Sequence, residues 1–544
     1  MSAGENMKRE TGPAVVFAIA IHLIAFTLLL NSRTAMRALN LETMAQYQPL
    51  ALSLAEAKDK NVAEEAAAGG EPAPQNPAVE QPLPSTSDQL PFTLPKNASV
   101  RGDTPSNTPP TPTQAADPME DLSSSLSKGA PLGTGTQGVA IARAAYHGRS
   151  KALRSRALED NGGSKQTEEA VLDGLRWLAS VQDLRPASKE SYGRWDGDEF
   201  MTGYLPRGEG ENLFAYRDRC AAEGAGSPVR DLGLTAFATL AFTGAGYTRS
   251  SPDFGRNVAA SLDYIVRTQD AEGCFLSRQM ASGGDMYDHA LSLLTLADYA
   301  AMSGDTELRA PVEKGLKFLI SRQQPTGGWD YRCYPTANEP PRSDMSITGF
   351  ALAAILSARA AGVEIPSQVF ARLRSCIETN TQADGAGMYA DAGIGVRRTS
   401  LGMTAVNLFC RRVLGQSFDH DVHKRQVAAL RRSLPDYAQA NDLDTDPYQW
   451  YYTGMALIME GGEEWQRYNV ELKRTLVEHQ DKAEGPRKGS WPATSYYGKN
   501  YGRVYSTAIS CLCLEVYYRH LPEFMRISGR SLSHIWGEDE GAED

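Results

Sequence analysis

The chain has 544 residues, a formal net charge of −11 at pH 7, and 41% hydrophobic residues. This length allows roughly two to four domains, and the acidic balance excludes a general nucleic-acid binder, which would carry a basic face. The seven cysteines are scattered, form no Cys-x-x-Cys pair and accompany no histidine cluster, so neither a structural zinc site nor a disulfide framework is expected.

An almost unbroken apolar run covers residues 12–30, after an N-terminal tail of residues 1–11. As a helix it would be about 28 Å long, close to the thickness of a bilayer core. No clear cleavage site follows, so the run predicts an uncleaved transmembrane helix. Basic residues flank both ends equally, but a short tail before a long domain favours an extracytoplasmic C-terminal domain. The sequence therefore predicts a single-pass membrane protein.

Residues 31–138 are rich in Pro, Ala, Thr and Ser and have few apolar residues to bury. This composition predicts a largely disordered linker. Residues 139–165 form a basic segment that we interpret as a collar helix. A membrane-surface or partner-docking helix is one interpretation of it, and a solvated collar leading into the next domain is the one we favour.

Residues 166–525 repeat one pattern, which is clearest at Gly315–Trp329. Val312, Leu316 and Leu319 share one helix face, Gln323 ends the helix, and Gly327-Gly328 leads to Trp329. Repeats at such a period indicate a repeat architecture. The structural positions of the copies are Gln182, Trp195, Gln269, Gln323, Trp329, Gln480 and Trp491.

Between these amphipathic helices lie runs that are apolar nearly all round and follow a capping residue. They are Leu232–Phe242 after Asp231, Ala290–Ala301 after Asp285 or Asp288, Met345–Ala360 after Asp344, Leu401–Leu414 after Thr399 or Ser400, Tyr448–Met459 after Asp446-Pro447, and Val504–Arg519 after Arg503. With Lys424–Leu434 as a weak fifth outer helix, outer and inner helices alternate. The alternation predicts an all-α fold, a closed (α/α)6 toroid, followed by an acidic tail at 526–544.

The pattern Gly-x-x-Phe/Trp-Leu-x-x-x-Gln with a later Gly-x-Trp, as in Gly315–Trp329 and Gly174–Gln182, resembles the repeat of squalene–hopene cyclases, oxidosqualene cyclases and protein prenyltransferase β subunits. The resemblance covers about 150–525 and is closest to membrane-anchored bacterial proteins with these repeats and unknown function. It implies the terpenoid cyclase/prenyltransferase type of α/α toroid.

In such a toroid the N-termini of the inner helices gather at one mouth, together with the long loops 183–230, 324–343 and 481–502. The first of these loops is a candidate lid. Class II cyclases protonate an alkene with the middle Asp of an Asp-x-Asp-Asp motif. The nearest match here is Asp442–Asp446, which lacks the adjacent pair, so Asp444 and Asp446 are candidate acids. Asp446 before Pro447 is equally explained as a helix cap.

Aromatic and polar residues near the inner-helix starts are candidates for ligand binding, as walls that stabilise a cation or bind a lipid or sugar. They are His289, Asp344, Trp450, Tyr451, Tyr452, Arg503 and Tyr505. Core packing is the alternative for the aromatic residues, and helix ties or ion pairs are the alternative for His289 and Arg503. The Asp-x-Cys and distal His that hold zinc in prenyltransferases are missing, so neither a metal nor a cofactor is expected.

Two classes of function follow. The first is a membrane-anchored, non-catalytic toroid that binds an apolar or isoprenoid-like ligand or a protein partner. The second is a terpene cyclase/mutase or prenyltransferase-type enzyme with non-standard acid residues. The missing Asp-x-Asp-Asp motif and zinc ligands favour the first. A closed, aromatic-lined cavity with a carboxylic acid at its polar end would favour the second.

Overall fold

The computed structural model describes residues 142–186, 189–200, 207–277, 285–335, 340–393, 395–442, 444–520, 525 and 532–536, all within the unit Ala130–Asp544. The predicted tail 1–11, membrane helix 12–30 and linker 31–138 lie outside these residues, as does most of the acidic tail. No described helix is long and apolar enough to cross a membrane.

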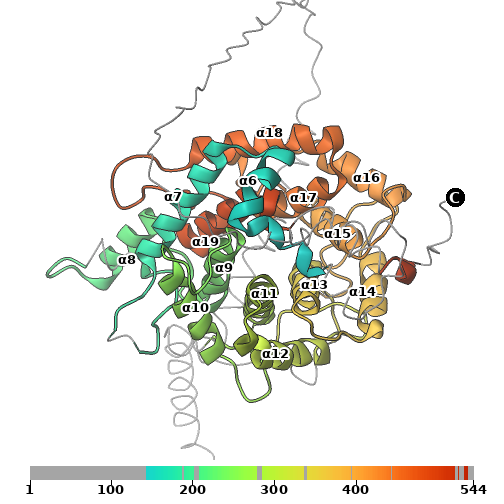
Figure 1. Cartoon of the computed structure of the whole chain (residues 1–544), viewed down its shortest axis with the longest axis horizontal. Helices are drawn as coiled ribbons and strands as arrows, with labels where there is room; N and C mark the ends of the chain where they lie inside the picture. Colours follow the sequence, from blue (N-terminus) through green and yellow to red (C-terminus); the bar gives the residue numbers. More distant parts are fainter. Residues whose placement is uncertain are drawn as a thin grey trace, which may run out of the picture. The chain divides into compact units, whose positions relative to one another are not determined.

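Six helices of the described chain form an inner ring in which each packs against the next (Figure 1). They are α9 (Asp231–Gly244), α11 (Met286–Ser303), α13 (Met345–Ala360), α15 (Leu401–Val413), α17 (Pro447–Glu460) and α19 (Tyr496–Leu514). α19 also packs against α9, so the ring closes. Every residue of α9 is buried, as expected for a helix surrounded by protein.

The described outer helices lie around this ring. They are α7 (Lys165–Val181), α10 (Gly255–Arg267), α12 (Arg309–Ser321), α14 (Ser367–Thr379), α16 (Asp421–Leu430) and α18 (Gly462–His479). Each buries one apolar face, for example Val258, Leu262 and Ile265 of α10. The shorter elements include α8 (Leu213–Ala222) in the long loop 183–230 and α20 (Val516–Arg519) after α19. The predicted all-α toroid is confirmed for the described residues.

Four glutamines of the described chain join neighbouring outer helices. The Gln323 amide nitrogen donates to the Gly327 carbonyl in its own turn at 2.8 Å and to the Val369 carbonyl on α14 at 3.1 Å. Gln480 does the same with Gly489 and, at 2.8 Å, with Ala170 on α7, which joins the last outer helix to the first. We call this arrangement the glutamine clamp. Gln182 and Gln269 form the other two clamps.

A tryptophan anchors the turn after each of three clamps. The Trp329 indole nitrogen donates to the Leu319 carbonyl at 2.7 Å, and its backbone nitrogen donates to Thr348 Oγ1 on the next inner helix at 3.2 Å. Trp195 and Trp491 make the equivalent bonds. All three rings are fully buried. The turn is thus fixed to the outer helix before it and to the inner helix after it.

In the degraded copy of the repeat after α14, a residue from the next outer helix pairs with the carbonyl group of the turn. Asn380 stands where the clamp needs a glutamine, and its amide nitrogen donates to the Cys376 carbonyl and to the Cys376 sulfur of its own helix. Gln426 of the next outer helix, α16, reaches back instead and donates to the Gly385 carbonyl at 3.0 Å. The turn carbonyl is therefore still paired, as buried backbone groups must be.

The predicted caps Asp285, Asp344, Ser400 and Asp446 are confirmed, each accepting a backbone N–H of the first helical turn. The prediction for Asp231 is wrong, because Arg230 is the cap residue of α9. Asp231 instead accepts the Gly197 N–H at 2.9 Å and pairs with Arg194 at 2.7 Å, so it anchors a loop.

Two helix boundaries differ from prediction. The run expected at Val504–Arg519 begins earlier, at Tyr496, and is interrupted at Gly502, whose φ of 83° suits only glycine. A side chain there would also meet the backbone of Gly226 at 2.6 Å. The helix expected at Lys424–Leu434 is α16, Asp421–Leu430.

The basic segment 139–165 contains η1 (His147–Arg149) and α6 (Lys151–Asp160) rather than one continuous helix. It is not solvated throughout, because Arg149 is buried against Asp298 of α11, with bonds of 2.6 and 2.9 Å. Arg149 also donates to the Arg519 carbonyl at 2.7 Å. Residues ahead of the toroid thus occupy the end of the inner ring where the inner helices finish.

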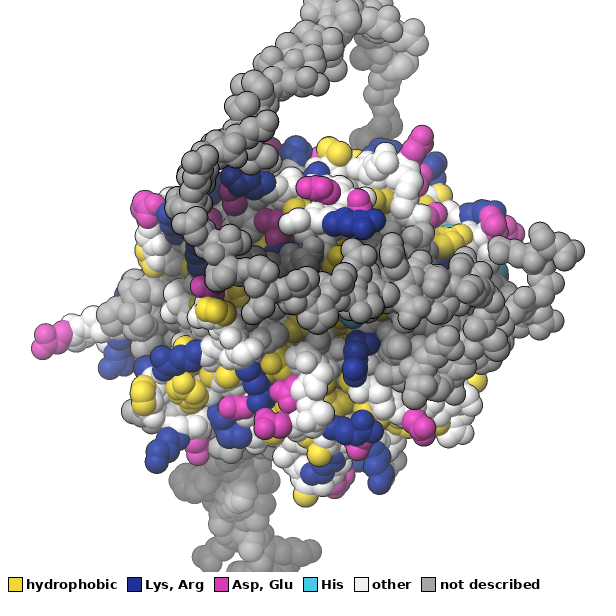
Figure 2. Space-filling view, viewed as in Figure 1, with side chains coloured by type: hydrophobic (Ala, Val, Ile, Leu, Met, Phe, Trp, Pro, Cys, Tyr) yellow, Lys and Arg dark blue, Asp and Glu magenta, His cyan; other side chains and the backbone are white. Residues whose placement is uncertain are grey.

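The described acidic and basic side chains are intermixed over the face drawn in Figure 2.

Within the predicted acidic tail, Trp536 is nearly buried and donates to the Leu414 carbonyl at 2.9 Å.

We predict that Gln323→Ala destabilises the toroid by about 1–3 kcal/mol, because two buried carbonyl groups lose their shared donor. Gln324→Ala is the matched control, since the neighbouring Gln324 is partly exposed. Urea denaturation of both variants measures the difference. Equal stability of the two variants would contradict the role of the clamp.

Candidate functional site

The turns that precede the inner helices set a common register. In four repeats the turn donates a backbone N–H to a threonine, and the fifth uses His289, whose Nδ1 accepts from the Phe275 nitrogen at 3.2 Å. Each acceptor lies four residues after one of five reference positions near the helix starts, which are Asp231, Asp285, Asp344, Ser400 and Arg503. The threonines are Thr235, Thr348, Thr404 and Thr507.

His289 therefore occupies a threonine position between the two rings of helices. Its ring stacks on Phe275 and meets the edge of Phe318. Burial lowers its pKa to about 3, which keeps the imidazole neutral and able to accept the Phe275 N–H. Its contacts are those of a helix tie.

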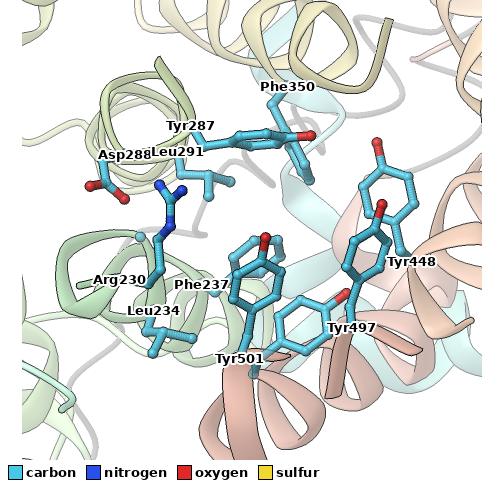
Figure 3. Close-up of a pocket in the computed structure, with 12 residues that line it drawn as sticks. Arg230, Leu234, Phe237, Tyr287, Asp288, Leu291, Phe350, Tyr448, Tyr497 and Tyr501 are labelled. Carbon is cyan, nitrogen blue, oxygen red and sulfur yellow. The ribbon is translucent and has the colours of Figure 1, made fainter. Parts of the chain in front are cut away.

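The same register places other positions in the lumen, where they line a cavity (Figure 3). Most of the wall comes from residues two, three or six places after these reference positions, with Asp446 as the reference position of α17. The lining residues are Arg230, Gly233, Leu234, Phe237, Tyr287, Asp288, Leu291, Phe350, Tyr448, Tyr497, Tyr501 and Tyr505. The cavity offers about 70 Å³ to water-sized molecules, and most of its wall is apolar.

Aromatic rings from five inner helices make up most of this wall. Phe237 meets Phe350 and Tyr505 edge to face, with ring centres 5.6 and 5.7 Å apart. Tyr497 and Tyr501, from the part of α19 before the Gly502 interruption, stack at 5.9 Å. Faces of such rings carry negative potential, so a wall of this kind can stabilise a positive charge.

Asp288 is the carboxyl group of the described cavity wall, and it is 1% exposed. Burial, with a smaller contribution from Asp285, raises its pKa to about 8, although Arg230 acts in the opposite direction. It is therefore protonated at neutral pH. Its Oδ2 atom is buried and has no hydrogen-bond partner in the described structure. The group is a carboxylic acid facing an apolar, aromatic chamber.

Gly233 of α9 makes room for this acid. A Cβ atom added at Gly233 would lie 2.7 Å from Asp288 Oδ1, which is too close for a real contact. Arg230, the cap residue of α9, pairs with Asp285 and lies beside Asp288 in Figure 3. A guanidinium here would stabilise the Asp288 carboxylate once its proton has been given up.

A hydrogen-bond chain leaves the cavity on its other side. The Tyr287 hydroxyl donates to Ser346 Oγ, and Ser346 Oγ donates to Asp344 Oδ1. The fully buried Asp344 carboxylate also accepts the Ser346 backbone N–H at 2.9 Å and pairs with Arg342 at 2.9 Å. Asp344 is thus a helix cap that is connected to the cavity through two hydroxyl groups.

The two candidate acids lie outside the cavity wall. Asp446 caps α17, and its two oxygens accept the backbone N–H groups of Tyr448 and Tyr497 at 2.9 and 2.8 Å. Burial raises its pKa to about 6. Asp444 accepts the Leu401 N–H at 2.5 Å, and burial raises its pKa too. Both carboxyl groups are engaged in holding backbone.

Of the residues predicted to bind a ligand, Tyr505 lines the cavity. Tyr452 packs behind the wall, against Phe350, and Trp450 packs against Tyr437. Tyr451 meets the edge of Tyr452. Arg503 donates to the Glu223 carbonyl and to Ser490 Oγ, both at 2.9 Å, and so holds two loops.

From the sequence, Asp288 is a candidate helix cap and one of four carboxylates that could serve a glycosidase, but it is not among the predicted cyclase acids, although a partial signal for that role is present. Asp285-Met286-Tyr287-Asp288 matches Asp-x-Asp-Asp at its first and fourth positions, with Tyr287 at the position of the middle Asp. Arg230 and Tyr497 had no signal in the sequence. Among the described residues no group of three or more His, Cys, Asp or Glu side chains could hold a metal ion.

No protein-family model matches the sequence, and no curated protein matches it. Solved structures with a similar fold include the type II terpene cyclase MstE from Scytonema, at 12% identity, a TM-score of 0.42, and coverage of 66% of this chain and 98% of that one. Cellobiose 2-epimerase from Spirochaeta thermophila matches at 15% identity and a TM-score of 0.46, over 68% and 98%. D-mannose isomerase matches at 11% identity and a TM-score of 0.44, and the match covers 65% of this chain and 97% of that one.

The α/α toroid of the described residues is established by their own helix order and packing. At such low identity the similarity concerns the fold and extends to no residue of the cavity.

We predict that Asp288→Asn changes how stability depends on pH. The folded state keeps the Asp288 proton up to about pH 8, whereas the unfolded chain releases it near its ordinary pKa of 3.8. Wild-type stability therefore falls as pH rises between these values, by about 1.4 kcal/mol per pH unit from this group. The variant lacks this loss, so it gains relative stability from pH 4 to pH 8.

Thermal denaturation across this pH range measures the effect. The control is Asp263→Asn, which removes an exposed carboxylate of α10. Parallel curves for Asp288→Asn and wild type would show that Asp288 ionises normally.

Proposed function

We propose that the toroid is an enzyme of the terpene cyclase/mutase type, in which Asp288 protonates a carbon–carbon double bond of an isoprenoid-like substrate. The observation that carries the proposal is the neutral, buried Asp288 carboxyl group with one unpartnered oxygen, set in a cavity walled by aromatic rings. This reverses the preference for non-catalytic binding that the sequence suggested.

The proposed reaction needs no co-reactant. The alkene π electrons form a C–H bond with the Asp288 proton, which leaves a carbocation on the substrate and a carboxylate on Asp288. Arg230 stabilises the carboxylate, and the rings of Phe237, Phe350 and Tyr505 stabilise the cation. Loss of a proton from a neighbouring carbon gives a product that is an isomer of the substrate.

The cavity size limits what enters. Since one water needs about 10–15 Å³ of such space, roughly five to seven non-hydrogen atoms fit in the cavity. One isoprene unit has this size, so the reacting end of the substrate would occupy the cavity and the remainder would extend toward the mouth. The predicted membrane helix at 12–30 would hold an extracytoplasmic toroid near a bilayer, where isoprenoid lipids reside.

We predict that the full chain converts at least one isoprenoid from a panel of squalene, geranylgeraniol and geranylgeranyl diphosphate. In D₂O, mass spectrometry should find one deuterium added per product, because the Asp288 proton exchanges with solvent. Asp288→Asn should lower the rate by about 10²–10⁴-fold, while Asp263→Asn leaves it unchanged. The proposal fails if no substrate is converted or if Asp288→Asn converts it at the wild-type rate.

A second prediction concerns the placement of the acid. Gly233→Ala should push the Asp288 carboxyl group aside and lower turnover about ten-fold or more, because the new methyl group would lie within 2.7 Å of Oδ1. Gly454→Ala is the matched control on α17, where the nearest atoms are 3.9 Å away. Equal turnover of the two variants would show that Asp288 tolerates displacement.

A further inference from the structure

We propose that Tyr287 accepts the proton that the carbocation loses, while its own hydroxyl proton passes through Ser346 to the Asp344 carboxylate. This inference rests on the proposed function and assigns the second proton transfer of the same site. It gives the cavity separate groups for proton entry, at Asp288, and for proton exit, at Tyr287.

The argument begins with the direction of the hydrogen bonds. The Tyr287 hydroxyl lies in the cavity wall and donates its hydrogen to Ser346 Oγ. Ser346 Oγ in turn donates to Asp344 Oδ1. A carboxylate paired with Arg342 can only accept. The orientation of the chain is therefore fixed by its end, and the Tyr287 oxygen keeps a lone pair for a donor inside the cavity.

The chain also spans two elements. Tyr287 belongs to α11, whereas Ser346 and Asp344 belong to the start of α13. All three side chains are hydrogen-bonded: Asp344 caps α13 through the Ser346 backbone N–H, Ser346 Oγ donates to Asp344, and the Tyr287 hydroxyl donates to Ser346 Oγ. Such pre-positioned hydroxyl groups can pass a proton with little rearrangement.

The atoms balance across the step. The substrate C–H bond breaks and its electron pair forms the new C=C bond. The released proton binds the Tyr287 oxygen as the Tyr287 hydrogen moves to Ser346 and the Ser346 hydrogen moves to Asp344. The substrate cation and the Asp344 carboxylate are both neutralised, and Arg342 stays in place. Proton exchange with solvent then restores neutral Asp288 and ionised Asp344.

Tyr448 provides the internal comparison. Its hydroxyl also lies near Ser346, but it donates to the Ser346 backbone carbonyl at 3.3 Å. A carbonyl oxygen cannot pass a proton onward, so this bond ends there. Tyr448→Phe removes a hydroxyl group from the same wall without interrupting the chain, and it is the matched control for Tyr287→Phe.

A pair of cationic probes tests the proton acceptor without turnover. Protonated N,N-dimethylgeranylamine resembles the carbocation and carries one N–H, while the trimethylgeranylammonium ion has the same charge and no N–H. Calorimetry with the full chain should show that Tyr287→Phe lowers the affinity for the first probe by about ten-fold or more, because a hydrogen bond to a charged group is lost. The affinity of Tyr287→Phe for the second probe should differ from that of wild type by less than about two-fold. Tyr448→Phe should change the affinities for the two probes by the same factor.

The turnover assay supplies the second measurement. With the chain interrupted in Tyr287→Phe or Ser346→Ala, the cation persists, and products should shift from alkenes toward alcohols formed by water capture. Asp263→Asn should keep the wild-type ratio, and Tyr448→Phe, which removes a wall hydroxyl outside the chain, should shift the ratio less than Tyr287→Phe does.

The outcomes separate the two proposals. If the probe difference appears but no isoprenoid is converted, Tyr287 is a proton acceptor for a bound cation and the proposed function fails. If turnover depends on Asp288 while Tyr287→Phe leaves both the probe affinities and the product ratio unchanged, the inference is overturned and the proposed function stands. Failure of both probes to bind the wild-type chain also overturns it.

Discussion

The glutamine clamp is the interaction on which the rest of the structure depends. One buried amide joins the turn of its own repeat to the next outer helix, and Gln480 joins the last repeat to Ala170 of the first. Because each turn is also bonded to the inner helix that follows, the inner helices start at matching heights. Neither an amphipathic pattern nor apolar burial alone would impose this common register, since both tolerate sliding of one helix along another.

The register explains why one carboxyl group differs from its neighbours. Asp285, Asp344 and Asp446 each open an inner helix, and their charges are compensated by backbone N–H groups or by arginine. Asp288 lies three residues into its helix and points into the lumen, where such partners are scarce. At the opposite end of the inner ring, Asp298 is paired with Arg149, which keeps its pKa well below the ordinary value despite burial. Asp288 and Asp298 are thus two buried carboxyl groups of α11 whose pKa values are shifted in opposite directions.

The sequence predicts the ring and misses most of the cavity for a physical reason. Helix periodicity and the Gly327–Trp329 turn are local signals, so they predict which helices form and which rings are buried. The face that a residue presents to the lumen depends on the register, which hydrogen bonds distant in sequence decide. The sequence predicted a wall from Tyr505 and from the three adjacent aromatics at 450–452; Tyr505 lines the cavity, whereas Tyr448 and not residues 450–452 supplies the ring from α17. Tyr497 and Tyr501 reach the cavity from the part of α19 that precedes the interruption at Gly502.

The central claim is that Asp288 is a neutral acid at physiological pH, and infrared spectroscopy of the full chain tests it most directly. The difference spectrum between wild type and Asp288→Asn at pH 7 isolates this group from the other buried carboxyl groups. The account predicts a protonated-carboxyl carbonyl band in the wild type that is absent from the variant and fades as pH rises past about 8. A carboxylate band in its place at pH 7 would contradict the account.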